Sequence, residues 1–457
     1  MNKQNSVDLG SGNVGKLLFS LALPTITSQI VNMLYNLVDR VYIGHMQPVD
    51  TVGSLALTGV GVCLPVIMII SAFAALLAMG GAPRASIAEG RGDLAESERI
   101  MGNCFTMLVT ISLVLTVVFR LFAEPLLLTF GASENTIGYA LSYMNIYSLG
   151  TIFVQMTLGM NAYITAQGFT TVSMKTVLIG AILNTILDPI FIFGLSMGVR
   201  GAALATILSQ AVSAAWVLRF LLGPRTKWHL RRENLRPRAK VVLPCLALGL
   251  SPFIIKSTES LIAVCFNSSL LKYGGDIAVG AMTVLTSINQ LVSMPLQGIC
   301  QGGQPIMSYN YGAGKPERVK EAFRCQFTVC VGYTVVFWLL LMVVPQVFAG
   351  IFTSDVELVT YTAWAIRIFL AGAFSVGFQI SCQQSFMALG QAKYSLLMAC
   401  LRKLILLIPL IFILPNFFAD KVFAVFLAEP VSDILAAAIT TITFLTHFNK
   451  FLYGEKK

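Results

Sequence analysis

Charged side chains are scarce in this sequence. Asp, Glu, Lys and Arg make up 11% of its 457 residues, whereas a soluble globular protein has about 25%. Hydrophobic residues make up 56%, and apolar runs long enough to cross a bilayer core of roughly 30 Å recur throughout. The composition excludes an ordinary soluble domain and predicts a multi-pass membrane protein. The first run is too long and too interrupted by polar residues for a cleaved signal peptide, so we expect it to remain as the first span.

Motifs of enzymes and metal sites are lacking as well. The three histidines, His45, His229 and His447, fall at the ends of apolar runs or between them, and the nine cysteines form no Cys-x-x-Cys pair. The glycine-rich segment 302–314 does not end in the Lys-Ser/Thr pair of a phosphate-binding loop. We therefore expect no enzymatic activity and no cofactor.

What the sequence does contain is an internal repeat. Residues 80–92 (GGAPRASIAEGRG) and 302–314 (GGQPIMSYNYGAG) lie 222 positions apart and share glycine, proline and serine at matching places. The same separation relates Tyr139 to Tyr361, Gly150 to Gly372, Gly168 to Gly390 and Ser173 to Ser395. A duplicated membrane bundle is typical of a secondary transporter.

The apolar runs predict an all-α fold with twelve transmembrane helices. We place them at 16–42, 52–80, 98–122, 134–160, 171–194, 201–222, 241–270, 277–303, 323–346, 356–382, 395–415 and 421–446. The basic segment 223–240 then becomes a cytoplasmic linker between an N-terminal lobe, 1–222, and a C-terminal lobe, 241–457. Six spans per lobe give both copies the same orientation, so we expect a parallel repeat about an axis along the membrane normal.

The positive charge follows this topology. The net charge is +10, and most Lys and Arg fall in segments predicted to be cytoplasmic. The predicted external segments hold Arg40, Arg120, Arg200, Lys272 and Lys421, and the spans hold Lys256 and Arg367. We interpret this bias as a topology signal rather than as nucleic-acid binding. It predicts a multi-pass protein of the bacterial inner membrane with both termini in the cytoplasm.

Polar side chains recur on single faces of three predicted helices. They are Gln29, Asn32, Asn36 and Asp39 on the first, Gln290, Gln297, Gln301 and Gln304 on the eighth, and Gln379 and Gln383 on the tenth. Because lipid-facing side chains are apolar, these faces point inward. They line a substrate cavity or form hydrogen bonds between helices.

Acidic residues inside the spans indicate ion coupling. Asp188 follows Asn184 by one turn and precedes Pro189, which frees backbone carbonyls in the same helix. Asp39 lies at a similar depth near the outer end of the first helix, so the two carboxylates can converge. A pair in a low-dielectric pocket shares a proton or binds a cation. The alternatives are an ion pair between Asp39 and Arg40 and a hydrogen bond from Asp188 at the kink.

The second half carries other intramembrane charges, whose roles the sequence leaves open. Glu259 follows Lys256 by three residues and belongs to a cavity or to an ion pair. Glu429 and Asp433 share one face around Pro430. Arg367 lies near mid-membrane on the predicted tenth span.

Several segments together resemble the multidrug and toxic compound extrusion (MATE) transporters, in particular the bacterial exporters of cationic drugs. They are ALPTITSQIVNMLYNLVDRVYIGHM, GGAPRASIAEGRGD, LNTILDPIFIFG, GVRGAALAT and GGQPIMSYNYGAG. The resemblance implies a monomeric, two-lobed antiporter that exports lipophilic organic cations in exchange for Na⁺ or H⁺. It implies a coupling site at Asp39, Asn184, Asp188 and Thr206, where Na⁺ is the candidate metal.

The resemblance extends only in part to the second half. Glu259 stands seven residues after Pro252, as in one branch of the family, but Phe378 occupies the place of the partner Asp. This difference favours coupling in the N-terminal lobe. The alternative function is a lipid-linked oligosaccharide flippase of the same superfamily, although the acidic and amide-bearing candidates do not suit a pyrophosphate.

Overall fold

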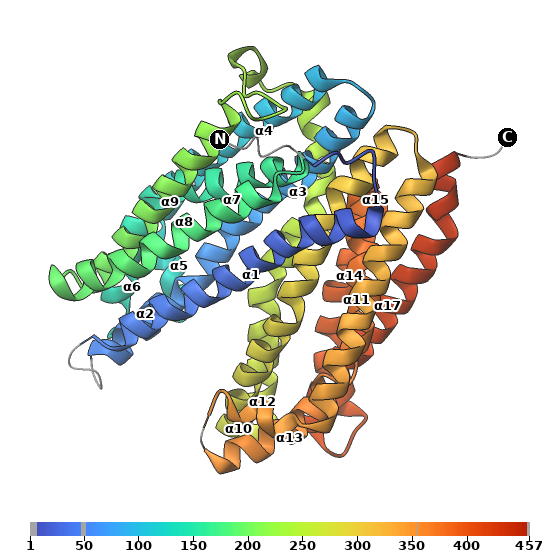
Figure 1. The fold of residues 1–457 in the computed structure, drawn as a ribbon. Coiled ribbons are helices and arrows are strands. Elements are labelled where there is room, and N and C mark those ends of the chain that lie inside the picture. The colour runs from blue at the N-terminus through green and yellow to red at the C-terminus, as the bar shows by residue number, and fades with distance from the viewer. Residues whose placement is uncertain (1–6, 47–51, 354, 455–457) are drawn as a thin grey trace. The chain divides into compact units, whose positions relative to one another are not determined.

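The computed structural model describes residues 7–46, 52–353 and 355–454, and this part of the chain is almost entirely helical (Figure 1). The first half contains α1 (Val14–Gly44), α2 (Ser54–Val62), α3 (Leu64–Gly90), α4 (Leu94–Leu121), α5 (Ala123–Thr129), α6 (Ile137–Leu149), α7 (Thr151–Ala166), α8 (Thr170–Pro189), the π-helical η2 (Ile190–Gly194), α9 (Val199–Leu221) and the short η3 (Arg232–Leu235). The second half contains α10 (Ala239–Gly312), α11 (Pro316–Val343), α12 (Pro345–Gly350), α13 (Val356–Phe369), α14 (Ala373–Ala388), α15 (Ala392–Cys400), the π-helical η4 (Leu401–Leu407), α16 (Ile408–Ile413), η5 (Leu414–Asn416) and α17 (Lys421–Tyr453).

These elements account for the twelve predicted spans. Nine helices of the described residues are long and apolar enough to cross a membrane singly, and α13 with α14, bent by 50°, makes a tenth. α10 has 74 residues and breaks at Gly275, whose φ of 66° is left-handed, so it forms two spans. α6 and α7 are short, but only Gly150 separates them, so together they form one more span.

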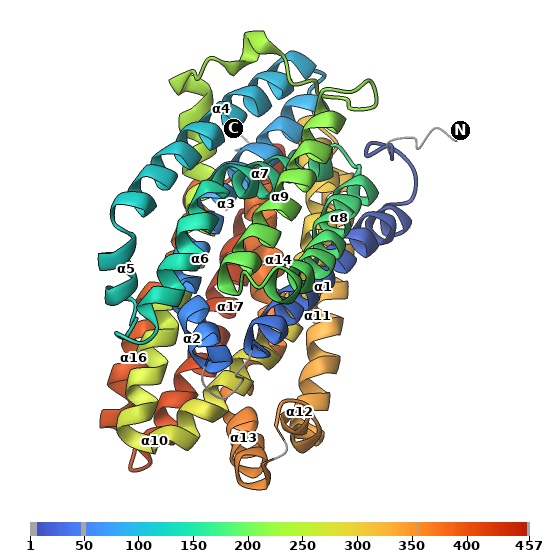
Figure 2. The same ribbon diagram turned by 90° about the vertical axis from the view of Figure 1, so that its left-hand side faces the viewer.

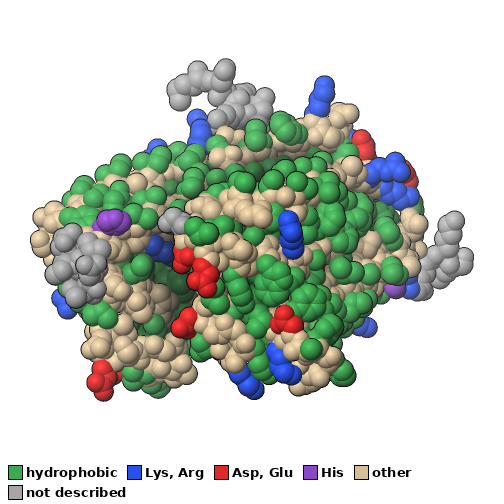
Figure 3. Space-filling view, turned by 90° about the horizontal axis from the view of Figure 1, so that it is seen from below, with side chains coloured by type: hydrophobic (Ala, Val, Ile, Leu, Met, Phe, Trp, Pro, Cys, Tyr) green, Lys and Arg blue, Asp and Glu red, His purple; other side chains and the backbone are tan. Residues whose placement is uncertain are grey.

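The outer faces of equivalent helices are apolar and exposed. On α4, Val114 and Leu121 are 56% and 70% exposed, and their counterparts on α11, Val336 and Val343, are 60% and 70% exposed. Hydrophobic side chains also cover much of the face drawn in Figure 3, where charged side chains are scattered between them. Such surfaces are stable against lipid rather than water, which confirms an all-α membrane protein.

The repeat is visible in individual hydrogen bonds. Ser86 Oγ donates to the carbonyl of Ala166 at 2.9 Å, and 222 positions later Ser308 Oγ donates to that of Ala388 at 2.8 Å. Both carbonyls end a helix, α7 and α14 respectively, and lack a partner within it. α4 and α11 also begin and end at equivalent residues. The parallel internal repeat is therefore built into the packing.

The described chain forms two compact units. One consists mainly of Thr27–Lys256, and the other of Leu9–Ile26 with Ser257–Lys457. The unit boundaries therefore lie inside α1, just after its internal Pro24, and inside α10. The first part of each of these helices belongs to the unit built mostly from the other half of the chain.

Glycines allow these first parts to pack closely. In the first unit, a Cβ at Gly80 of α3 would overlap the carbonyl oxygen of Cys245 in α10. In the second unit, a Cβ at the equivalent Gly302 would lie 2.6 Å from Cα of Ala22 in α1. Only a residue without a side chain permits either approach. Thr25 Oγ1 then bonds the carbonyl of Gly298 at 2.6 Å.

The basic segment 223–240 is docked on the first unit. Gln167 Oε1 accepts hydrogen bonds from Thr226 Oγ1 at 2.8 Å and from the backbone nitrogen of Trp228 at 3.1 Å, and the Trp228 side chain is fully buried. Arg231 pairs with Glu98 at 2.8 Å. These contacts hold the segment against α4 and α7.

Candidate ion and substrate sites

The first unit brings the predicted coupling residues together. Asn184 and Asp188 lie one turn apart on α8, and Asn184 Nδ2 donates to Asp188 Oδ1 at 3.1 Å. The same amide lies 3.4 Å from Thr206 Oγ1 on α9, and Thr206 Oγ1 donates to the carbonyl of Ala202. Asp188 is fully buried. α8 ends at Pro189 and continues as the π-helical η2. Proline has no backbone N–H to donate, so a local departure from α-helical hydrogen bonding is expected at this position.

Asp39 of α1 completes this cluster. Its carboxyl group interacts directly with that of Asp188. Within the described residues no Lys or Arg forms an ion pair with either carboxylate, although Arg40 follows Asp39 in the chain and is exposed. The charge of Arg40 acts on Asp39, but two interacting carboxyl groups without an ion pair still favour a shared proton or a bound cation.

Three oxygen atoms of the cluster are buried without a hydrogen bond. They are Asp39 Oδ1, Asn184 Oδ1 and Asp188 Oδ2. Buried polar atoms are normally satisfied, so three unpaired oxygens on neighbouring side chains of one cluster fit a small cation or a proton. In the described part of the chain, no three His, Cys, Asp or Glu side chains gather as a metal site, so an ion here would rely on amide and hydroxyl oxygens as well.

Three tyrosines that the sequence reasoning missed, Tyr35, Tyr143 and Tyr147, interact electrostatically with Asp39. The Tyr35 hydroxyl group lies against the Gln210 side chain, and both Asp39 and Asp188 act electrostatically on it. Tyr143 and Tyr147 of α6 stack at 5.7 Å between ring centroids. Tyr35 lies one turn before Asp39 on the same helix, so helical periodicity could have predicted that the two side chains are neighbours. The position of Tyr143 and Tyr147 near Asp39 depends on how α6 packs and could not be predicted from periodicity.

The predicted cavity residues are divided between several environments. On α1, Gln29 and Asn32 are half-buried, while Asn36 is exposed and bonds the Asn32 carbonyl at 2.6 Å. On α10, the predicted residues Gln290, Gln297 and Glu259 are exposed. On α14, Gln379 and Gln383 are buried.

Gln383 makes a hydrogen bond between helices. Its amide donates to the carbonyl of Ser395 on α15 at 2.8 Å. The equivalent amide in the first half, that of Asn161, donates to the carbonyl of Ser173 at 3.3 Å. The repetition of this bond favours the packing interpretation for Gln383, which the sequence had left open beside the cavity interpretation.

The second unit contains a charge cluster that the sequence reasoning did not assemble. Arg402 Nε lies 2.8 Å from Asp433 Oδ1, and Arg402 Nη2 lies 3.8 Å from Glu429 Oε1. Arg402 and Lys403 are inside the apolar helical segment Ala392–Asn416. The prediction that the spans hold two basic residues, Lys256 and Arg367, is therefore wrong, because the predicted span 395–415 itself contains Arg402 and Lys403.

Comparison with known proteins now places the chain. The model of the MatE family matches residues 24–190 and 252–413, which is most of the sequence. The chain belongs to the MatE family. The two matched blocks follow the internal repeat, and the first contains Asp39, Asn184 and Asp188, whereas Thr206 lies beyond it.

Curated relatives and solved structures agree with this assignment. The multidrug export protein MepA of Staphylococcus haemolyticus (strain JCSC1435) is 23% identical over 432 residues, which is 93% of each chain. MepA of Staphylococcus aureus (strain N315) is 22% identical over 428 residues, again 93% of each chain. A crystal structure of MATE in the bent conformation has a TM-score of 0.91 and 21% identity, and the match covers 98% of this chain and 99% of the other. A MOP superfamily transporter from Pyrococcus furiosus, described as having a binding pocket of reverse polarity, has a TM-score of 0.90, 21% identity and 99% coverage of both chains. These structures establish the twelve-helix, two-lobed MATE fold.

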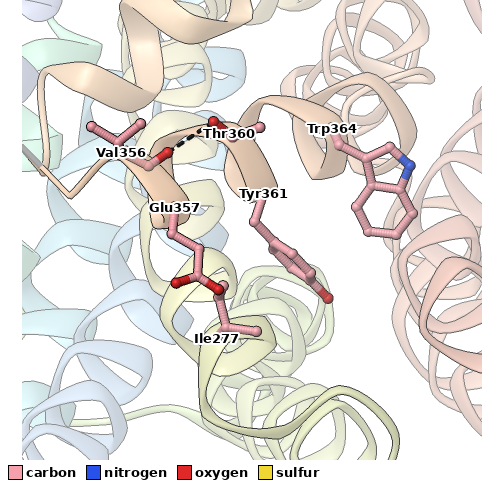
Figure 4. A pocket seen from close by; sticks show the side chains of 6 residues that line it. All are labelled: Ile277, Val356, Glu357, Thr360, Tyr361 and Trp364. Atoms are coloured by element: carbon pink, nitrogen blue, oxygen red, sulfur yellow. Dashed lines mark hydrogen bonds between the residues drawn. The ribbon is translucent and has the colours of Figure 1, made fainter.

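This MatE protein also has an open groove on its second unit. It is lined by Ile277 of α10 and by Val356, Glu357, Thr360, Tyr361 and Trp364 of α13, and its volume is about 740 Å³ (Figure 4). Its lining is mostly apolar and includes none of the predicted cavity or coupling residues. Thr360 is turned to its own helix, where its hydroxyl bonds the Val356 carbonyl at 2.8 Å.

Proposed function

We propose that this protein is a secondary active antiporter that exports bulky organic, mostly cationic compounds in exchange for Na⁺ or H⁺. The observation that carries the proposal is the contact between Asp39 and Asp188 with buried, unpaired oxygens around it. Charged groups within membrane spans are costly and mark ion pathways. Membership of the MatE family and similarity to proteins named multidrug exporters support the same function.

The coupling step follows from the electrostatics of this pair. The two carboxyl groups interact directly and neither is in an ion pair with a Lys or Arg of the described chain, so binding of a cation or a proton stabilises the cluster. Release of that ion toward the cytoplasm leaves repulsion between Asp39 and Asp188, which favours a different arrangement of α1 and α8. Such a difference in affinity between two states is what couples an ion gradient to export.

Efflux of ethidium from cells and proteoliposomes tests the proposal. We expect Asp39→Asn and Asp188→Asn each to lower export about tenfold or more, which is within the range of coupling free energies. Asp276→Asn removes an exposed acid beside the α10 break and serves as the matched control with export unchanged. If both cluster variants export ethidium like the parent protein, the coupling site is elsewhere.

Transport driven by an imposed ion gradient identifies the coupling ion. Proteoliposomes receive an inwardly directed Na⁺ gradient at equal pH, or a pH gradient without Na⁺. If one of these two gradients drives ethidium export, and the export is lost in Asp188→Asn, that gradient identifies the coupling ion. Export that follows neither gradient contradicts antiport, and preferential binding of a polyprenyl pyrophosphate over a lipophilic cation would favour a lipid flippase instead.

A further inference from the structure

The second half of the basic segment 223–240 exposes several basic side chains whose charge the protein does not neutralise. Among the described residues none of them forms an ion pair, and one exposed acid, Glu233, lies between them in the sequence. Arg231 differs, because it pairs with Glu98. The bases without an ion pair are Arg232, Arg236, Arg238 and Lys240.

Helix α4 holds this part of the segment in one conformation. Asn103 is fully buried, and its Nδ2 donates to the carbonyl of Asn234 at 2.9 Å. Its Oδ1 accepts a hydrogen bond from the backbone nitrogen of Arg238 at 2.6 Å. Thr106 Oγ1 donates to the carbonyl of Leu235, also at 2.6 Å. The bases are therefore presented by a folded surface of the first unit rather than by a free linker.

The equivalent segment of the second unit is attached in the same way without these charges. The carbonyl of Gly12, 222 positions before Asn234, accepts a hydrogen bond from Arg318 Nη1 of α11 at 2.9 Å. The positions equivalent to the four bases are Gly10, Val14, Lys16 and Leu18. Attachment of the segment to its unit therefore does not account for the bases.

An exposed apolar stripe of α10 begins at the last of these bases. Lys240, Leu243, Ala247 and Leu250 are all exposed, and Leu243 is 62% exposed. They follow one another at three or four residues, so they share one face of the helix. Cys245, on another face, packs against α3. The stripe is thus charged at the end of a predicted span and apolar inside it, which matches the polarity of a phospholipid in the adjacent leaflet.

We propose that the segment 223–240 and this stripe of α10 form a binding site for an anionic phospholipid of the adjacent leaflet, which we predict to be the cytoplasmic one. The lipid phosphate lies among the bases, and an acyl chain lies along Leu243, Ala247 and Leu250. Guanidinium groups suit phosphate oxygens because they donate two parallel hydrogen bonds. A zwitterionic phospholipid would bring its own cation beside four bases, and a nucleic acid would leave the apolar stripe uncovered. The site is separate from the proposed coupling residues and does not depend on the export function.

Binding of two labelled lipids tests the site. Purified full-length protein in a non-ionic detergent is titrated against phosphatidylglycerol or phosphatidylcholine with the same fluorophore on one acyl chain, and fluorescence polarisation reports binding. We expect phosphatidylglycerol to bind at least tenfold more tightly, and added salt to weaken it. Each base near an anionic lipid is worth about fivefold in affinity.

Neutralisation of three bases should remove the preference. The triple variant Arg232→Gln, Arg236→Gln, Lys240→Gln should lower the affinity for phosphatidylglycerol by about tenfold or more and leave phosphatidylcholine within about twofold. The charge-keeping variant Arg232→Lys, Arg236→Lys, Lys240→Arg should retain the preference. Thermal unfolding of each variant shows whether it is folded, and the replaced side chains are all exposed.

The matched control is the triple variant Arg91→Gln, Arg324→Gln, Lys393→Gln, which removes three exposed bases elsewhere on the same predicted side. It should leave both affinities within about twofold, and so should Asp188→Asn. Equal affinity of the parent protein for the two lipids, or equal losses in the two triple variants, would overturn the proposal. Displacement of the labelled lipid by its free headgroup, glycerophosphoglycerol, as readily as by unlabelled phosphatidylglycerol would also overturn it, because the site would then bind phosphate without an acyl chain.

Discussion

Two buried aspartates of this protein have opposite environments. Asp188 contacts another carboxyl group and an amide, and no base among the described residues pairs with it. Asp433 is also buried but is paired with a guanidinium group at 2.8 Å. The first arrangement needs an exchangeable cation or proton, whereas the second is complete within the protein. Their difference separates a group suited to transport from a group suited to holding helices together.

Removal of Arg402 alone should destabilise the second unit strongly. Arg402→Leu leaves Asp433 buried without a partner, which costs about 3–5 kcal/mol. The double variant Arg402→Leu with Asp433→Leu removes both charges and should recover most of that loss. Denaturant unfolding in detergent measures both. A double variant as unstable as the single one would show that the pair is not the cause.

At the scale of the helices, glycines at the crossing points set the distance between neighbouring helices. Gly80 lies in the first unit, where the first part of α10 crosses α3. Gly302 lies in the second unit, where the first part of α1 crosses the second part of α10. The hydrophobic effect does not drive helices together in lipid, so close backbone approach and its dispersion energy carry more of the packing. The glycine-rich repeat segments therefore act as contact surfaces as well as turns.

Substitution at one of these glycines should separate the helices. Gly80→Ala places a methyl group against the Cys245 carbonyl, and overpacking of this kind costs about 1–3 kcal/mol. Gly332→Ala on α11 is the control, because nothing lies within 4 Å of its added Cβ. It should be neutral or stabilising by up to about 1 kcal/mol, the helix-propensity difference. Thermal melting in detergent compares the two, and equal melting temperatures would contradict the packing role of Gly80.

On the scale of the whole molecule, the two halves repeat their connections as well as their helices. Ser86 and Ser308 perform the same task at equivalent places, and each satisfies the last carbonyl of a helix. Charge does not follow the repeat: the carboxylate pair belongs to the first unit and the mixed-charge cluster to the second. The two halves therefore share a helical scaffold, whereas each unit has its own polar chemistry.

The serine pair provides a test of this equivalence. Ser86→Ala and Ser308→Ala each leave a buried carbonyl unsatisfied and should cost about 1–3 kcal/mol. The two serines lie in different units and bond different carbonyls. The free-energy cost of the double variant should therefore equal the sum of the two single costs to within about 0.5 kcal/mol. Unfolding in detergent gives the three values. A large cost at one serine and none at the other would contradict equivalence.

The membrane orientation is a further whole-molecule prediction. With basic residues concentrated in the segment 223–240, we expect both termini and this segment to be cytoplasmic. Alkaline phosphatase fused after Gly454 should be inactive, while the same enzyme inserted at Gly275, between the two spans of α10, should be active. Fluorescent-protein fusions at both positions provide the opposite readout. Phosphatase activity at the C-terminal fusion would reverse the topology.

The sequence by itself determined the fold class and part of the candidate site. Apolar runs and a 222-residue repeat are local or self-similar patterns, and a bilayer permits few structures other than helices for such runs. Helical periodicity likewise placed Asn184 and Asp188 on one face, because residues four apart in a helix are neighbours.

Only the tertiary structure decided which distant groups meet. The pairing of Arg402 with Asp433, and the contact between Asp39 and Asp188, depend on how separate helices are rotated and how deep they pack. The assignment of the first parts of α1 and α10 to opposite units has the same origin. These outcomes depend on interactions between segments, for which periodicity within one helix contains no information.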